Sequence, residues 1–112
     1  MSTKIYEGKN TYSSDQIYTV EKGKFYNGKN TYSSDEIKSI NPNGINIVDF
    51  KKVYKGKNSY SSDQIMTIEK EKVYKGKNTY SSDQIATIQG DRLTDDEMEK
   101  VIYLLVQRNN LI

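Results

Sequence analysis

Four copies of the tetrapeptide Tyr-Ser-Ser-Asp place hydroxyl and carboxylate groups together, at residues 12–15, 32–35, 60–63 and 80–83. A serine nucleophile needs a neighbouring base to take its proton. The chain has no His, so only a lysine could act as that base, and four equivalent copies fit a structural rule better than one active site. Because Asp and Ser readily bond backbone amides in turns, we expect turn-forming roles and no catalysis. The turn carboxylates are Asp15, Asp35, Asp63 and Asp83.

Metal and cofactor chemistry finds little support in the composition. The absence of both Cys and His removes disulfides, thiolate zinc sites and the usual imidazole ligand. Calcium sites need about six or more oxygens, and neither the EF-hand pattern nor Gly-Gly-x-Gly-x-Asp occurs. The sequence therefore predicts a protein without metal or cofactor, and not an enzyme.

The charge of the chain is small and unevenly placed. Residues 1–90 carry 14 Lys against 10 acidic residues, whereas residues 91–112 carry 3 basic against 5 acidic ones, for a net charge of +2. Nucleic-acid binding is disfavoured by this balance and by the lack of Arg before Arg92. No stretch approaches the roughly 20 apolar residues of a membrane span, and the first residues contain no apolar signal run. We expect a cytoplasmic protein without membrane contact.

The Tyr-Ser-Ser-Asp tetrapeptides belong to a longer repeat of about 20 residues. Each unit begins with an apolar residue and Tyr, continues as x-Gly-Lys-Asn-Thr/Ser-Tyr-Ser-Ser-Asp-x-Ile, and ends in a β-prone run. The second unit is longer by eight residues, and its Asn41-Pro42-Asn43-Gly44 segment reads as an enlarged turn with one extra strand. The units are Ile5–Lys24, Phe25–Lys52, Val53–Lys72 and Val73–Arg92 of a single domain, residues 1–112.

Two short β-prone runs around a polar turn predict a β-hairpin in every unit. Alternation along the strand then predicts that Ile17, Ile37, Ile65 and Ile85 face the core and that Tyr18, Lys38, Met66 and Ala86 face solvent. A turn or bulge conformation that other residues adopt at a cost is expected at Gly8, Gly28, Gly56 and Gly76.

The alternative is a parallel β-helix, in which equivalent residues stack about 4.7–4.9 Å apart. Stacking would align the four repeat Asp residues in one column and the four repeat Lys residues in another, and like charges directly opposite one another destabilise a sheet. We therefore expect a mainly β fold, in which antiparallel hairpin repeats form a rolled or closed meander.

The last segment changes period and predicts one helix over about residues 94–108. Thr94 and Glu97 fit a capping box, and an apolar stripe follows at i, i+3, i+4 and i+7. We expect the helix to pack on the sheet, with an oligomer contact as the alternative. The stripe consists of Met98, Val101, Ile102 and Leu105.

Eight repeat tyrosines form the candidate binding surface. An exposed set beside Lys would offer stacking platforms and cations suited to sugar rings or unpaired bases. The alternative places one Tyr of each unit in the core and the other between strands. The first set is Tyr6, Tyr26, Tyr54 and Tyr74, and the second is Tyr12, Tyr32, Tyr60 and Tyr80.

The run Val73–Ile88 resembles the repeat of small bacterial proteins of unassigned activity, built from tandem Tyr-x-Gly-(x)3-Tyr-Ser-Ser-Asp units. The resemblance covers about residues 4–92 and implies a β-repeat fold without an activity. A looser resemblance links the chain to choline-binding cell-wall repeats, whose Trp residues are missing here. We expect a structural or protein-interaction module that binds another protein or itself, with carbohydrate binding as the alternative and single-stranded nucleic acid third.

Overall fold

The computed structural model describes residues 2–112 and contains eight strands and one helix. Short 3-10 turns at the Ser-Ser-Asp segments connect strands that belong to one unit. The strands are β1 (Thr3–Glu7), β2 (Gln16–Glu21), β3 (Lys24–Asn27), β4 (Ile45–Val48), β5 (Lys52–Lys55), β6 (Gln64–Glu69), β7 (Lys72–Lys75) and β8 (Gln84–Gly90), and the helix is α1 (Asp95–Arg108).

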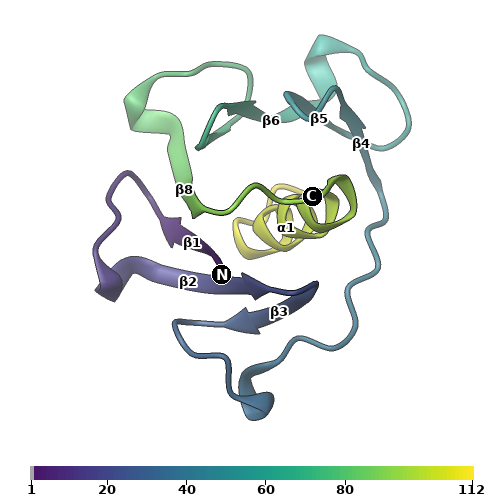
Figure 1. Ribbon diagram of the computed structural model, residues 1–112. Coiled ribbons are helices and arrows are strands. Elements are labelled where there is room, and N and C mark those ends of the chain that lie inside the picture. Colours follow the sequence, from purple (N-terminus) through teal and green to yellow (C-terminus); the bar gives the residue numbers. More distant parts are fainter. Residues whose placement is uncertain (1) are drawn as a thin grey trace.

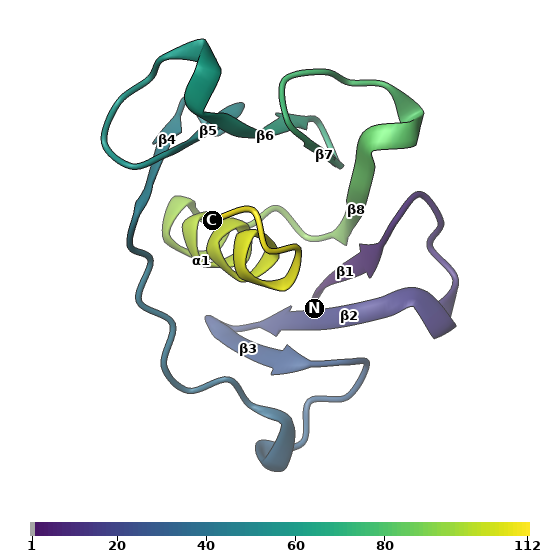
Figure 2. The ribbon, with the colours of Figure 1, turned by 180° about the vertical axis from the view of Figure 1, so that it is seen from behind.

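All eight strands belong to one antiparallel sheet that curls around the helix (Figures 1 and 2). The strand order is β3-β2-β1-β8-β7-β6-β5-β4, so the first strand pairs with the last and the sheet is open between β3 and β4. The prediction of an antiparallel, rolled sheet with a packed C-terminal helix is confirmed, and the parallel β-helix is excluded. The break in the sheet lies in the middle of the chain, because strand pairing joins the two ends of the repeat array.

The pairing of β1 with β8 reproduces the contact between successive units. Ile5 lies opposite Ile88 just as Phe25 lies opposite Val20 across β3 and β2. The fourth unit therefore meets the first through the same register, although no hairpin turn links them. Gly90 has a φ of +122°, and a Cβ there would lie 2.5 Å from the carbonyl oxygen of Ser2, so this seam requires a glycine.

A β-bulge overturns part of the predicted alternation. Ile5 pairs with Tyr18 but Tyr6 pairs with Gln16, so Ile17 is the extra residue of the bulged strand. Both neighbouring side chains then lean toward the core: Tyr18 is buried in it and Ile17 is half-buried against it.

The same register shift separates Val53 from Tyr54 and Val73 from Tyr74. The prediction that Tyr18, Met66 and Ala86 face solvent is therefore wrong, because all three lie in the core, whereas Lys38 is exposed. Ile17, Ile37, Ile65 and Ile85 pack only partly against the core.

The helix begins with the predicted capping box. The amide of Glu97 donates to Thr94 Oγ1 at 3.1 Å, and the amide of Thr94 donates to Glu97 Oε1 at 2.9 Å. The apolar stripe is buried inside the same chain, with Met98 half-buried at its start. The fully buried helix residues are Val101, Ile102, Leu105 and Val106.

The second unit contains the opening of the sheet. Tyr26 and Glu36 form an isolated bridge, after which the chain leaves the sheet until Gly44. The Gly56 amide donates to the Gly44 oxygen at 2.8 Å, in the way that the Gly28 amide donates to the Ile17 oxygen at 2.7 Å. The strand β4 is thus the second strand of this unit and pairs with β5 as β2 pairs with β3. The eight-residue insertion does not add a ninth strand.

Candidate functional site

Four loops of identical design project from the outside of the curled sheet (Figure 1). Each begins at a glycine with a φ between +75° and +80° and ends in a 3-10 turn. A backbone hydrogen bond closes that turn, as when the Asp15 amide donates to the Tyr12 oxygen at 2.8 Å. The prediction that the Gly and Asp positions form turns is consistent with this geometry. We call residues 8–15, 28–35, 56–63 and 76–83 the first to fourth projecting loops.

The base of each loop is fixed by the preceding unit of the ring. In the first loop, the Gly8 amide donates to the Ile85 oxygen at 2.8 Å, and Thr87 Oγ1 donates to the Gly8 oxygen at 2.8 Å. Gln84 Nε2 donates in turn to Thr87 Oγ1 at 2.9 Å. This Gln–Thr–Gly chain holds the loop at a defined position on the sheet.

The second and fourth loops are held in the same way. Thr19 Oγ1 donates to Gly28 and Thr67 Oγ1 to Gly76, each supported by a Gln side chain. The third loop follows the opening of the sheet, where Asn46 replaces the Thr and donates to the Asn58 oxygen at 3.3 Å. Three loops therefore share one anchor, and the third has a longer and different one.

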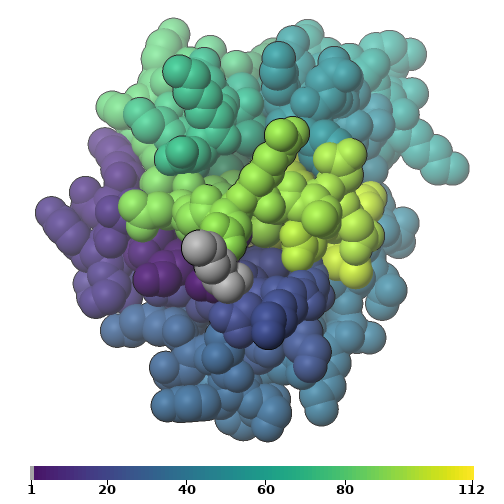
Figure 3. Space-filling model, in the orientation of Figure 1, coloured from purple at the N-terminus to yellow at the C-terminus, as the bar shows by residue number. Residues whose placement is uncertain are grey.

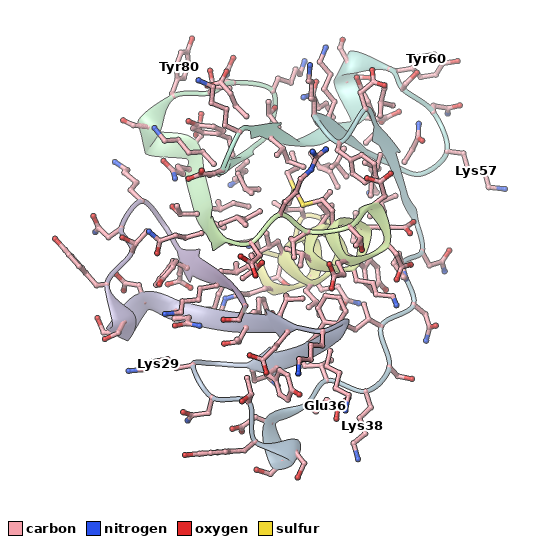
Figure 4. The ribbon with its side chains drawn as sticks, viewed as in Figure 1. Lys29, Glu36, Lys38, Lys57, Tyr60 and Tyr80 are labelled. Carbon is pink, nitrogen blue, oxygen red and sulfur yellow. The ribbon has the colours of Figure 1, made fainter. Side chains whose placement is uncertain are left out.

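The structure divides the eight repeat tyrosines into two environments. The four at the strand ends are buried outside the main core, between 4% and 8% exposed, so their rings are not available to a ligand. The four in the loops are between 64% and 66% exposed, and Figure 4 shows Tyr60 and Tyr80 pointing away from the body of the protein. The accessible members of the candidate surface are Tyr12, Tyr32, Tyr60 and Tyr80.

A comparison of the units with one another separates the loops from the core. The first apolar position takes three residue types in the four units, being Ile5, Phe25, Val53 and Val73. The core position after the bulge changes from Tyr18 to Met66 to Ala86. The exposed loop sequence, Lys-Asn-Thr/Ser-Tyr-Ser-Ser, hardly changes at all. The loop sequence is therefore as uniform as the buried tyrosines Tyr6, Tyr26, Tyr54 and Tyr74, although its side chains are exposed.

The electrostatics of the loops are nearly balanced. Each loop contains one Lys and one Asp, and the flanking position varies between Glu7, Asn27, Lys55 and Lys75. Among residues 2–112, no group of three or more Asp or Glu side chains is placed to hold a metal ion. Each loop carries an exposed aromatic ring, an ammonium, an amide and hydroxyl groups, which can stack on a ligand and form hydrogen bonds with it.

Sequence reasoning missed a cleft of about 880 Å³ at the end of the ring where α1 begins. Its apolar wall is formed mainly by Phe50, Ile68, Ile88, Leu93 and Met98, and its rim carries charges of both signs. Figure 3 shows the segment that leads into α1 crossing this end between the two halves of the sheet. No periodic signal could have revealed the cleft, because it is formed by the hairpin turns β4–β5 and β6–β7 together with the β8–α1 connection.

A family model described as the 6-fold beta flower protein matches residues 39–111, which is more than half of the chain. The chain belongs to the 6-fold beta flower family. The matched region contains β4 to β8 and α1, and therefore two of the four projecting loops. The repeat-based β fold expected from the sequence agrees with this membership. The comparisons with curated proteins and with solved structures found no match. Within residues 2–112, the helix of this beta flower protein is too short and too polar to cross a membrane.

Proposed function

We propose that this beta flower protein is a non-catalytic interaction module whose projecting loops each contribute one contact to a protein partner. The observation that carries the proposal is the exposed loop sequence, which is repeated four times although two core positions differ from unit to unit. The rings of the loop tyrosines are between 64% and 66% exposed, so packing within the chain does not by itself require an aromatic residue there. A shared binding role accounts for their uniformity.

Tyrosine suits such a contact. Its ring supplies a large amphipathic area and loses little conformational entropy on binding, which is why Tyr is common at the centres of interfaces. The glycine at the base of each loop is tied to the neighbouring unit by its amide, so the loops hold defined positions before a ligand arrives. Preorganised sites of this kind lower the entropic cost of binding.

Four equal contacts also make the binding multivalent. When one loop is engaged, the others reach their sites at a high effective concentration, and the total affinity exceeds that of one loop by orders of magnitude. A ligand with repeated features, such as an oligomeric protein, would gain most. Carbohydrate is the second candidate, favoured by the exposed ring and by the exposed Asn, Ser and Lys of the same loop, which can hydrogen-bond sugar hydroxyls.

The test compares variants with one, two and four of the loop tyrosines replaced by Ala. Wild-type and variant proteins are used in pull-downs from cell lysate and on glycan arrays, with circular dichroism as a check of folding. Each replacement should weaken binding about tenfold, equivalent to about 1.4 kcal/mol. Tyr103→Ala is the matched control, because Tyr103 is a half-buried tyrosine of α1 outside the loops.

The two assays separate the candidates. A protein partner that is lost stepwise with the tyrosines supports the proposal, whereas stepwise loss of a sugar signal supports the carbohydrate alternative. A folded quadruple variant that keeps every wild-type partner and glycan would contradict both.

A further inference from the structure

The free edge of β4 is a second surface, independent of the projecting loops. Among residues 2–112, β4 pairs only with β5. The Gly56 amide donates to the Gly44 oxygen, so alternation along the antiparallel ladder turns the backbone groups of Asn46 and Val48 toward β5 as well. The backbone N–H and C=O groups of Ile45 and Ile47 therefore point away from the sheet.

This edge lacks the usual protection against strand addition. Natural edge strands carry charged residues, proline or bulges, but β4 reads Ile-Asn-Ile-Val and all four residues are half-buried. The opposite edge is covered, because Glu36 bridges Tyr26 and the Ile37 amide donates to the Phe25 oxygen at 2.7 Å. The sheet therefore has one closed and one open edge.

A cleft of about 530 Å³ lies beside the open edge. Ile45, Ile47 and Phe50 give it an apolar wall, and the first turns of α1 give it an acidic one. Residues 37–43 do not line this cleft. The acidic wall consists of Asp95, Asp96 and Glu99.

The rest of the sheet shows which strand fits beside β4. The strands β2, β6 and β8 have the same place in their units as β4, and their partners on the corresponding edge are β1, β5 and β7. Each partner carries Lys, an apolar residue that enters the core, and Tyr. These segments are Lys4-Ile5-Tyr6, Lys52-Val53-Tyr54 and Lys72-Val73-Tyr74.

In a strand added beside β4, the residue two positions before the apolar one decides whether the strand's charge complements the acidic wall. In the chain's own strands this residue is Thr3, Lys51 or Glu71, and the last two line the cleft at the beginning of α1. The same position in a strand added to β4 lies next to the acidic wall. A basic residue there is attracted by the carboxylates, and an acidic one is repelled.

We propose that the free edge of β4 binds an extended segment of another polypeptide as a ninth antiparallel strand. The segment has the pattern basic-x-apolar-Tyr. Its backbone bonds the free groups of Ile45 and Ile47, its apolar residue lies opposite Ile45, and its basic residue faces the acidic wall. Strand addition of this kind takes affinity from the main chain and specificity from alternate side chains.

The protein's own sequence provides a matched pair of peptide probes. Lys-Lys-Val-Tyr-Lys-Gly-Lys has the sequence of residues 51–57, and Glu-Lys-Val-Tyr-Lys-Gly-Lys has that of residues 71–77, so they differ only at the first position. Capped, fluorescently labelled peptides are titrated with the full-length protein. The peptide 51–57 should bind at least tenfold more tightly than the peptide 71–77.

Two variants locate the binding. Ile47→Pro removes an outward N–H while sparing the β4–β5 ladder, and it should abolish binding of both peptides while circular dichroism stays unchanged. Asp95→Asn combined with Glu99→Gln leaves the ion pair between Lys100 and Asp96 in place, and it should bring the two affinities to within about twofold.

Three results would overturn the proposal. The first is equal affinity of the two peptides, or no binding, with the wild-type protein. The second is undiminished binding to a folded Ile47→Pro variant. The third is a wild-type protein that self-associates in sedimentation and becomes monomeric on Ile47→Pro, since a second copy would then occupy the edge. None of these outcomes bears on the loop tyrosines.

Discussion

Leu105→Ala tests the central position of α1 within the curled sheet. Leu105 is 0% exposed and contacts the core formed by the strands around the helix (Figure 2). Buried Leu→Ala substitutions cost about 2.7–5.0 kcal/mol, and the cost rises with the volume of the cavity that remains. The surrounding strands form one continuous hydrogen-bonded sheet, with β3 and β4 at its two edges, so they cannot readily move inward. We therefore expect a loss of about 4 kcal/mol in the free energy of unfolding.

Leu104→Ala is the matched control for this measurement. Leu104 is the adjacent residue of the same helix and is only half-buried, so its truncation should cost about 1 kcal/mol, nearer the value of its transfer from water. Urea denaturation of both variants can be followed by circular dichroism. Domains of this kind are stable by about 5–15 kcal/mol, so the difference between the variants is readily measured.

Two results would refute the reasoning behind this prediction. Equally small losses for Leu104→Ala and Leu105→Ala would show that the helix is not packed against the sheet. A midpoint that rises with protein concentration would show that the apolar stripe is buried between subunits. A large, concentration-independent loss confined to Leu105→Ala is the expected outcome.

Two further substitutions probe the seam and the loop anchors. Gly90→Ala should destabilise the fold by about 2–3 kcal/mol, because a Cβ would meet the Ser2 backbone and φ is positive there. The control is Gly23→Ala, where a Cβ meets nothing within 4 Å, and this substitution should cost about 1 kcal/mol. Equal losses of the two variants in thermal denaturation would contradict the close approach at the seam. Gln84→Glu should lower the free energy of unfolding by about 1–3 kcal/mol, because a carboxylate cannot donate to Thr87 Oγ1 and the Ala86 oxygen as the amide does. An NMR spectrum that is unchanged at Gly8 and Thr87 would show that this anchor does not hold the first loop.

The sequence alone determined the features that depend on neighbours in the chain. The repeat, the antiparallel hairpins and the glycine turns follow from spacings shorter than one unit. The capping box of Thr94 and Glu97 involves residues three positions apart, so its prediction needed no tertiary information. The buried stripe of Val101, Ile102 and Leu105 followed from helical periodicity for the same reason.

The candidate site was predictable only as a set of residue types. Spacing shows that each unit carries two tyrosines at repeated positions, but not which of them is covered, because both lie beside β-prone segments. The environment is decided by the sheet, which buries Tyr6 at a strand end and leaves Tyr12 at the tip of a projecting loop. The clefts and the free edge of β4 are equally invisible in the sequence, since residues from distant segments form them.

Only the tertiary structure decided the faces of the strands and the pairing of the first strand with the last. One extra residue in a paired strand moves the following side chains to the other face, and the bulge at Ile17 does so for Tyr18. The seam between β1 and β8 likewise joins segments that are far apart in the chain, from Thr3 paired with Gly90 to Glu7 paired with Ala86, and the chain forms it because each unit presents the edge that every other unit accepts.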